Sequence, residues 1–192
     1  MNRLSHDQIA VLVVKAQQGD QEAFSMLYAA TVERQLAFAT AFLKDASLAE
    51  DAVQEVYLSM YKALPKLQNP KLFVAYLNRI CYNTCVDYKK KYFKQKFELE
   101  EDEDLTRISD DSPHNTPHER YEILENQNEL YQAVATLPDQ QQAAFLMRYY
   151  QDMKIRDISQ AMDISESTVK RYIRAASTQL KGMLSTIHRE RG

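Results

Sequence analysis

Apolar residues recur every three or four positions along most of the chain, which is the spacing that places them on one face of an α-helix. The 192 residues include only three glycines and five prolines, so long stretches contain nothing that would end a helix. No stretch between these breaks alternates apolar and polar residues in the way that a half-buried strand does. The pattern therefore predicts an all-α fold.

Two helices are predicted in the N-terminal half, over residues 47–64 and 72–97, with a proline-containing break between them. Ser47 is the expected N-cap of the first helix, and Glu50 and Asp51 are expected in its first turn, where the helix dipole favours acids. The expected apolar stripes are Ala49, Val53, Val56, Tyr57, Met60 and Leu64 in the first helix, and Phe73, Tyr76, Leu77, Ile80 and Thr84 in the second.

The polar face of the 47–64 helix carries Asp51, Gln54 and Glu55 together with one leucine, Leu58. A leucine among acids and an amide is typical of a protein-binding patch. Single exposed leucines are also ordinary on globular surfaces, so the pattern alone leaves both interpretations open.

The end of the 72–97 helix reads DYKKKYFKQKF and interleaves five lysines with aromatic residues. Cations suit a helix C-terminus because of the helix dipole. Aromatic rings beside cations also suit the unstacked bases and the phosphates of single-stranded DNA, so both interpretations stay open at this point.

The C-terminal half contains the pattern of a helix-turn-helix. Ile155, Ile158 and Met162 share one face of a short helix, and the three residues DIS then break the periodicity. Asp163 can adopt the left-handed conformation that such a turn often needs, and Ser165 is a good N-cap for the helix that follows. Two packing helices are expected before this motif, with apolar faces of Leu130, Val134 and Leu137 in one, and Ala144, Phe145, Met147 and Tyr149 in the other.

The second helix of this motif has an apolar face and a basic face on opposite sides. Its early residues would lie along the major groove of duplex DNA, where they meet bases and phosphates. A solvated basic face is the alternative interpretation of such a cluster. The apolar residues are Val169, Ile173, Ala176, Leu180 and Leu184, the basic ones are Lys170, Arg171, Arg174 and Lys181, and the expected DNA contacts are Ser167, Thr168, Lys170, Arg171 and Arg174.

The net charge of −3 hides a division into three segments. Residues 1–97 carry a net charge of +4, residues 98–125 one of −9 and residues 126–192 one of +2. The middle segment has few apolar residues and no helical stripe, as is typical of a flexible linker. We therefore expect two small helical domains, over 1–97 and 126–192, joined by an acidic linker over 98–125.

Little else in the sequence indicates a reactive site. Cys81 and Cys85 lie one turn apart on a predicted helix, where we expect small apolar core residues rather than a redox or metal pair. His114 and His118 have a spacing that could hold a metal, but no cysteine lies near them and we expect no metal site. No paired carboxylates, nucleophile with a base or phosphate-binding loop stands out, so no catalytic residue and no cofactor are expected.

The longest apolar run, Ile9 to Val14, is too short to span a bilayer. The first twelve residues lack the basic start, apolar core and cleavage site of a secretory signal. The sequence therefore predicts a cytoplasmic protein without direct membrane insertion.

Both halves of the chain resemble one family in these motifs, the extracytoplasmic-function group of sigma-70-type bacterial RNA polymerase sigma factors. The N-terminal resemblance runs through GDQEAFSMLY and AEDAVQEVYLSMYKAL to FVAYLNRICYNTCVDYKKK, and the C-terminal one covers LPDQQQAAFLMRYYQDMKIRDISQAMDISESTVKRYI. The resemblance implies a sigma region 2 domain and a sigma region 4 domain, in that order.

The resemblance also implies which residues act. The region 2 domain would bind the clamp helices of bacterial core RNA polymerase, and the region 4 domain would read the −35 element of promoter DNA as a duplex while docking on the polymerase flap. No catalytic residue is implied, because the polymerase supplies the chemistry, and an anti-sigma factor is a common partner in the family. The implied polymerase-binding residues are Asp51, Gln54, Glu55 and Leu58, and the residues implied to open and read the −10 element are Tyr76, Arg79, Asn83, Lys89, Lys90 and Lys91.

The main alternative is a helix-turn-helix transcriptional regulator that acts without replacing the sigma subunit, with the N-terminal domain used for dimerisation or effector sensing. This alternative predicts specific duplex binding in the absence of polymerase. Neither domain has a large net charge, and nonspecific DNA affinity depends mainly on phosphate neutralisation, so we expect each domain alone to bind DNA weakly. We also expect the acidic linker, through residues 100–104, to discourage DNA binding by the free protein.

Overall fold

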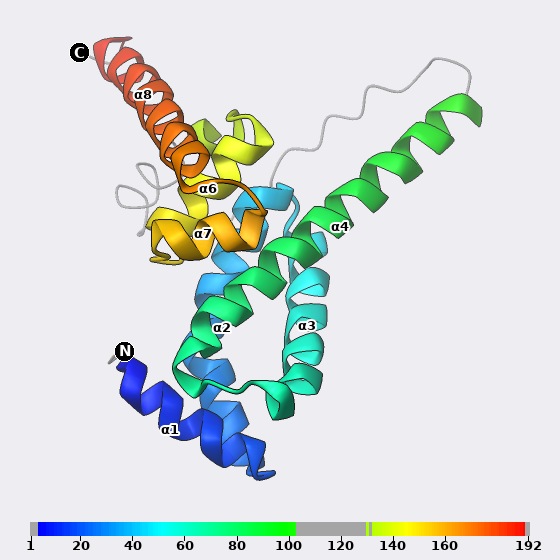
Figure 1. Ribbon diagram of the computed structural model, residues 1–192. Helices are drawn as coiled ribbons and strands as arrows, with labels where there is room; N and C mark the ends of the chain where they lie inside the picture. The colour runs from blue at the N-terminus through cyan, green and yellow to red at the C-terminus, as the bar shows by residue number, and fades with distance from the viewer. Residues whose placement is uncertain (1–3, 103–129, 131, 191–192) are drawn as a thin grey trace, which may run out of the picture.

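The computed structural model describes residues 4–102, 130 and 132–190, which are almost entirely helical (Figure 1). No strand occurs among these residues, and the all-α prediction is confirmed. None of the described helices is both long and apolar enough to cross a membrane. The elements are α1 (His6–Gln17), α2 (Gln21–Leu43), α3 (Ala46–Ala63), the 3-10 turns η1 (Leu64–Lys66) and η2 (Pro70–Leu72), α4 (Phe73–Asp102), α6 (Asp139–Tyr149), α7 (Ile155–Met162) and α8 (Glu166–Glu190).

Helix α3 begins slightly earlier than the sequence predicted. Asp45 is its N-cap, and the Asp45 carboxylate accepts a hydrogen bond from the N–H of Leu48 at 2.8 Å. The prediction that Ser47 caps this helix is therefore wrong, because Ser47 already lies inside the first turn. Glu50 and Asp51 consequently lie beyond the first turn, which contains no acid.

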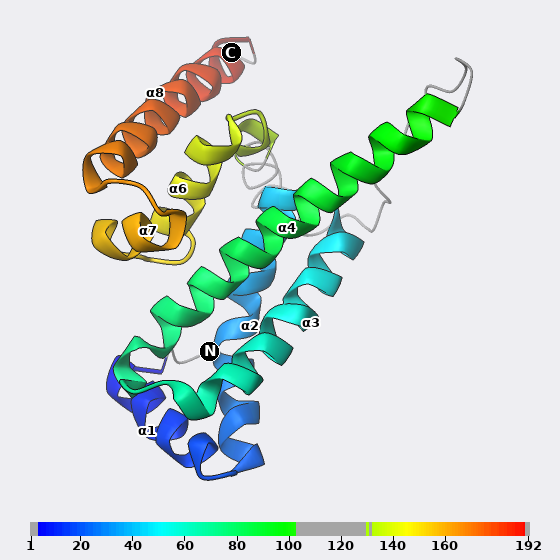
Figure 2. The ribbon, with the colours of Figure 1, turned by 45° about the vertical axis from the view of Figure 1, so that its right-hand side comes forward.

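Helices α2, α3 and α4 lie alongside one another, and α1 packs across one end of them (Figures 1 and 2). The side-chain amide of Gln17 donates to the carbonyls of Leu64 and Leu67, each at 2.9 Å, and so ties α1 to the segment between α3 and α4. Lys71 pairs with Asp7 of α1 at 3.0 Å, and this lysine holds the pKa of the Asp7 carboxyl below its usual range. The break that the sequence predicted at residues 65–71 is thus anchored to α1.

The predicted core face of α3 is confirmed, but that of α4 is displaced by one position. All six residues of the α3 stripe are buried. In α4, Phe73 and Leu77 are buried as expected, whereas Tyr76 is 39% exposed. The buried face continues at four-residue intervals through Cys81 and Cys85, not through the predicted isoleucine and threonine, which are only half-buried.

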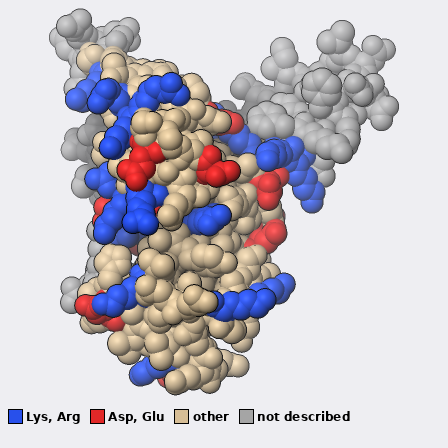
Figure 3. All heavy atoms as spheres, viewed as in Figure 1, with Lys and Arg blue, Asp and Glu red and all other residues tan. Residues whose placement is uncertain are grey.

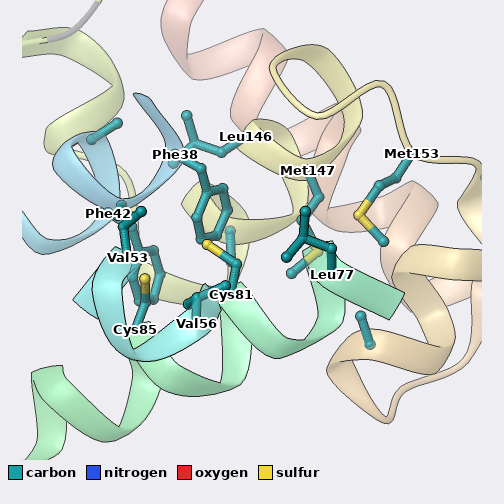
Figure 4. Packing of buried hydrophobic residues seen from close by; sticks show 14 of the residues in the cluster. Phe38, Phe42, Val53, Val56, Leu77, Cys81, Cys85, Leu146, Met147 and Met153 are labelled. Carbon is teal, nitrogen blue, oxygen red and sulfur yellow. The ribbon is translucent and has the colours of Figure 1, made fainter. Parts of the chain in front are cut away.

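The two cysteines fill the space where α2, α3 and α4 meet (Figure 4). The neighbouring Cys85 thiol and burial raise the pKa of Cys81, so this thiol stays protonated at neutral pH. Their expected role as small core residues agrees with this environment.

Helices α6, α7 and α8 form the C-terminal domain. Val169, Ala176 and Leu180 of α8 are buried as predicted, Ile173 is half-buried, and the side chain of Leu184 lies outside the described residues. The short segment before α6 is helical over 132–135, where its described apolar residues face the core.

The predicted face of α6 is only partly correct. Ala144 and Met147 are buried, but Tyr149 is 58% exposed, and the buried face also includes Gln142 and Leu146. The face is wider than the sequence predicted because α6 packs against α8 on one side and against α2 of the N-terminal domain on the other.

The two domains contact each other, which the sequence did not predict. Their buried apolar residues belong to one hydrophobic cluster. In Figure 4, Leu146 and Met147 of α6 lie beside Phe38 of α2 and Leu77 of α4. Helix α4 extends to Asp102, into the predicted linker, and the rest of that segment lies outside the described residues.

Leu77→Ala should lower the free energy of unfolding by about 2–5 kcal/mol, because it leaves a cavity in the core. Leu72→Ala is the matched control, since Leu72 is 53% exposed and loses the same atoms; its effect should stay within about 0.5 kcal/mol. Denaturant unfolding followed by circular dichroism measures both. Equal losses in the two variants would contradict the core face assigned to α4.

Candidate nucleic-acid interface

The turn between α7 and α8 is fixed by local hydrogen bonds. Asp163 adopts the predicted left-handed conformation with φ of 54°, and the N–H of Ile164 donates to the Ser159 carbonyl at 3.1 Å. Ser165 caps α8 as predicted, because its hydroxyl accepts a hydrogen bond from the N–H of Thr168 at 3.2 Å. These contacts set the direction in which α8 leaves the turn.

The five residues expected to contact DNA lie together at the start of α8. Ser167, Lys170, Arg171 and Arg174 are exposed, and Thr168 is half-buried. The two hydroxyl side chains of this set hydrogen-bond the capping serine, at 2.8 and 2.9 Å. Lys and Arg side chains gather over this part of the molecule, at the upper left of Figure 3. The face is open and positive, as a phosphate-binding surface requires.

Tyr172 supports this face from the side. Its hydroxyl donates to the side-chain oxygen of Gln140 in α6, and the guanidinium of Arg171 lies 5.5 Å from the centroid of its ring. A cation held against an aromatic face has a restricted set of orientations. Tyr172 therefore positions Arg171 and ties α8 to α6, a role that the sequence analysis missed.

Helix α4 presents a second candidate surface along one edge. Tyr76, Arg79, Asn83 and Lys90 are all exposed, and at about 100° per residue they fall within an arc of about 60°. Lys91 is also exposed and lies about 60° from Tyr76 on the other side. An aromatic ring, an amide and several cations are thus aligned on one helix, which is a combination suited to unstacked bases and phosphates.

Lys89 does not belong to this edge. Its side chain is only 14% exposed, and its ammonium lies 2.5 Å from the carboxylate of Asp139 in α6. The same ammonium lies 4.7 Å from the centroid of the Phe42 ring. The structure therefore groups five of the six residues implied for the −10 element and turns the sixth toward the C-terminal domain.

The outer face of α3 forms a third surface, with a different composition. Asp51, Gln54 and Glu55 are exposed, and Leu58 is 62% exposed among them. Burial and the nearby Glu55 and Asp51 carboxylates raise the pKa of Tyr88 on α4. Acids around an exposed leucine repel phosphates, so this face suits a protein better than DNA.

Tyr61 is a member of this face that the sequence analysis missed. It is 55% exposed and lies three residues after Leu58, so the two side chains share one side of α3. Its ring packs edge-on against Phe24 of α2, with centroids 5.0 Å apart. The helical spacing from Leu58 could have identified it.

The described residues offer little support for a metal site, the other chemistry that the sequence raised. The described residues contain no group of three or more His, Cys, Asp or Glu side chains that could hold a metal ion. His114 and His118 lie outside the described residues, and so do residues 103 and 104 of the acidic stretch 100–104.

Two family models match the chain, and they divide it at the acidic segment. The model described as Sigma-70 region 2 matches residues 27–94, and the model described as Sigma-70, region 4 matches residues 127–180. The chain belongs to the sigma-70 family. The region 2 match contains the α3 face and the α4 edge, and the region 4 match contains the helix-turn-helix.

Several curated relatives of this sigma-70 protein are aligned over nearly their whole length. The RNA polymerase sigma-H factor of Pseudomonas aeruginosa is 25% identical, over 97% of this chain and 99% of the relative. The ECF RNA polymerase sigma-E factor of Haemophilus influenzae is 24% identical, over 92% of this chain and 95% of the relative. The ECF RNA polymerase sigma factor SigW of Bacillus subtilis is also 24% identical, over 90% of this chain and 94% of the relative. The predicted membership in the extracytoplasmic-function group is confirmed.

Solved structures share the fold at lower sequence identity. CnrH, in its complex with the cytosolic domain of CnrY, is 19% identical with a TM-score of 0.66, over 93% of this chain and 97% of that one. The sigma factor RpoE of Bartonella quintana, in complex with the anti-sigma factor NepR, is 19% identical with a TM-score of 0.64, over 84% of this chain and 96% of that one.

Ser165→Ala should destabilise the first turn of α8 by about 1 kcal/mol, because the hydrogen bond from the Thr168 N–H to the Ser165 hydroxyl is lost. Hydrogen exchange of the Thr168 amide should accelerate by about fivefold in consequence. Ser25→Ala is the control, since Ser25 is an exposed serine that bonds only a carbonyl within α2. Unchanged protection at Thr168 would contradict the capping role.

Proposed function

We propose that this sigma-70 family protein is an alternative sigma factor, which binds bacterial core RNA polymerase, recognises −35 and −10 promoter elements and promotes DNA melting. The observation that carries the proposal is the presence of both sigma regions in order in one chain, each with its own exposed surface. We propose that the domains span 1–97 and 126–192, and that 98–125 is the linker. Because its partners are the polymerase and promoter DNA, we propose that it acts in the cytoplasm.

The basic face of α8 would read the −35 element. Lys170, Arg171 and Arg174 can reach base edges and phosphates of the major groove, while Ser167 and Thr168 lie at the helix start, where polar side chains contact the backbone. Phosphate contacts fix the position on the duplex and base contacts give the sequence preference.

The exposed edge of α4 would capture bases of the −10 element. Melting requires that a base, once it leaves the stack, is held in place, and Tyr76 and Asn83 offer a ring and an amide for this purpose. Arg79, Lys90 and Lys91 would neutralise the phosphates of the same strand. No bond is made or broken by these groups, so we assign no catalytic residue to the chain; the polymerase supplies the chemistry.

The outer face of α3 would dock on the clamp helices of the polymerase. Leu58 would supply the buried apolar contact at the centre, with Asp51, Gln54 and Glu55 around it as polar partners. An anti-sigma factor is a further proposed partner, because the sigma factor RpoE of Bartonella quintana, which shares this fold, is bound to the anti-sigma factor NepR in its solved structure.

Run-off transcription on a pool of genomic fragments, with core polymerase alone and with this protein added, tests the proposal. Initiation at a new set of start sites is expected, and it would give the −35 and −10 sequences together. The alternative regulator predicts no new initiation and tight, specific duplex binding by the protein alone. That second result would replace the sigma assignment.

Leu58→Asp should abolish binding to core polymerase while leaving the helix content unchanged, because it places a charge where the apolar anchor must be buried. Val11→Asp is the matched control, since Val11 of α1 is also exposed, at 57%, but lies on another surface. Co-purification with core enzyme measures both variants. Normal binding of the folded Leu58→Asp variant to core polymerase would contradict the assignment of the α3 face as the polymerase-binding surface.

Arg174→Ala should weaken transcription from promoters that need a −35 element by about 10- to 100-fold, since a lost base contact costs about 1–3 kcal/mol. Binding to core polymerase should stay unchanged, because Arg174 lies on α8, away from the α3 face. Lys181→Ala is a control with the same charge loss farther along α8. Equal losses of transcription in the two variants would show that Arg174 contributes only positive charge and makes no specific base contact.

A further inference from the structure

A cavity of about 430 Å³ is lined by residues of α2, α4 and the start of α6. Small-molecule sites in proteins commonly have volumes of about 300–1,000 Å³, so this cavity is large enough to hold a ligand. Lys90, one of its lining residues, is exposed to solvent. The cavity is therefore accessible from the surface.

One wall of the cavity is apolar and largely aromatic. Phe42 of α2 is buried, and its ring meets the ring of Tyr82 edge-on, with centroids 6.2 Å apart. Val86 lies one turn after Tyr82 on α4 and continues this wall. Two rings at an angle can both contact a flat aromatic ligand, one with its face and the other with its edge.

The charged lining residues leave one positive charge without a partner. Lys89 pairs with Asp139, the first residue of α6, so these two charges compensate each other. Lys90 makes no ion pair with any described residue. A ligand with a single negative charge would therefore complement the electrostatics of the cavity.

The polar groups that remain available to a ligand are hydrogen-bond donors. The side-chain oxygen of Gln140 accepts from the Tyr172 hydroxyl, so Gln140 can offer its amide N–H groups. Burial and, to a lesser extent, the Asp139 carboxylate raise the pKa of Tyr82, so its hydroxyl keeps its proton at neutral pH and can donate. The Lys90 ammonium can only donate. A carboxylate, which only accepts, matches this set of donors.

We propose that this cavity is a binding site for a small aromatic molecule that carries one carboxylate. The aromatic body lies against Phe42, Tyr82 and Val86, and the carboxylate meets the Lys90 ammonium. Because Lys90 also belongs to the exposed edge of α4, a bound carboxylate competes with a DNA phosphate for this lysine. That competition rests on the proposed function, whereas the binding site itself does not.

Isothermal titration calorimetry of the free 192-residue chain tests the site, with 2-naphthoate as the probe and the neutral 2-naphthamide as its matched control. 2-Naphthoate should bind about tenfold more tightly, since hydrogen bonds to a charged group are stronger than those between neutral groups. Equal affinities, or no binding of either compound, would overturn the proposal. Decanoate has the same charge without the rings and should bind more weakly than 2-naphthoate; tighter binding of decanoate would rule out an aromatic ligand.

Lys90→Gln should remove the preference for 2-naphthoate over 2-naphthamide, because the ammonium that meets the carboxylate is lost. Lys91→Gln is the matched control, since Lys91 is the next residue and is equally exposed, but is not among the residues that line the cavity. This control should keep the preference. Equal losses in the two variants would show that general charge on α4 attracts the probe, and would contradict the site.

Val86→Trp should abolish binding of 2-naphthoate, because the larger side chain fills the cavity. Val14→Trp is the control, since Val14 is 43% exposed and lies on α1. Circular dichroism identifies a variant that loses its fold. Methyl NMR of the unmodified protein locates the probe without any substitution: 2-naphthoate should shift the Val86 methyl resonances and leave those of Val14 in place. The reverse pattern would show that the probe binds elsewhere.

Binding of a fluorescent oligothymidylate tests the shared use of Lys90. Saturating 2-naphthoate should weaken this binding and lower the logarithmic salt slope by about 0.7, which corresponds to one phosphate contact by single-stranded DNA. In Lys90→Gln the probe should have no such effect. Unchanged oligothymidylate binding in the unmodified protein would refute the competition for Lys90.

The calorimetry contains neither DNA nor polymerase, so it fails or succeeds independently of run-off transcription. New start sites without binding of 2-naphthoate would leave a sigma factor that lacks this ligand site. Binding of 2-naphthoate that depends on Lys90, without new start sites, would support the ligand site and remove the proposed function.

Discussion

The burial of one face of α4 against α2 and α3 is the constraint on which the rest of the structure depends. Because a helix turns about 100° per residue, placing Leu77, Cys81 and Cys85 in the core fixes the direction of every other side chain on α4. Tyr76 and the residues in line with it then have to lie along the exposed edge. Lys89, one turn beyond Cys85, has to point toward the C-terminal domain. The register of the core thus decides which α4 residues would be available to DNA in the proposed function.

Sequence patterns predicted the structure correctly where it depends on residues that are close together in the chain. The stripe of α3 and the turn with Asp163 and Ser165 follow from periodicity and capping, and both were predicted. The buried face of α4 was not predicted correctly. Two adjacent stripes of this helix both contain apolar residues at helical spacing, and only packing against α2 and α3 decides which stripe is buried. Gln142 could not have been found, because a glutamine is expected at the surface unless a second domain covers it.

Charge separates the three surfaces as clearly as shape does. Cations occupy the start of α8 and the edge of α4, whereas the outer face of α3 carries Asp51 and Glu55 around Leu58. A phosphate backbone is attracted to the first two surfaces and repelled by the third, even though the chain as a whole is slightly acidic. In the proposed function, it is therefore the local sign of the charge, not the net charge, that suits two faces to DNA and the third to a protein.

The two interfaces of α2 differ in their chemistry. Against α3 and α4, helix α2 buries apolar side chains such as Phe38, Leu27 and Phe42, for which water offers no replacement. Against the C-terminal domain the contact is mixed: Phe38 lies beside Leu146 of α6 (Figure 4), and the Ala41 carbonyl and the Gln35 side chain accept hydrogen bonds from Gln142 and Gln151. Each buried acceptor that lacks a partner costs about 1–3 kcal/mol, so the side-chain oxygens of Gln142 and Gln151, which have no hydrogen-bond partner among the described residues, weaken this contact. The contact between the domains therefore combines buried apolar packing with incompletely paired amides.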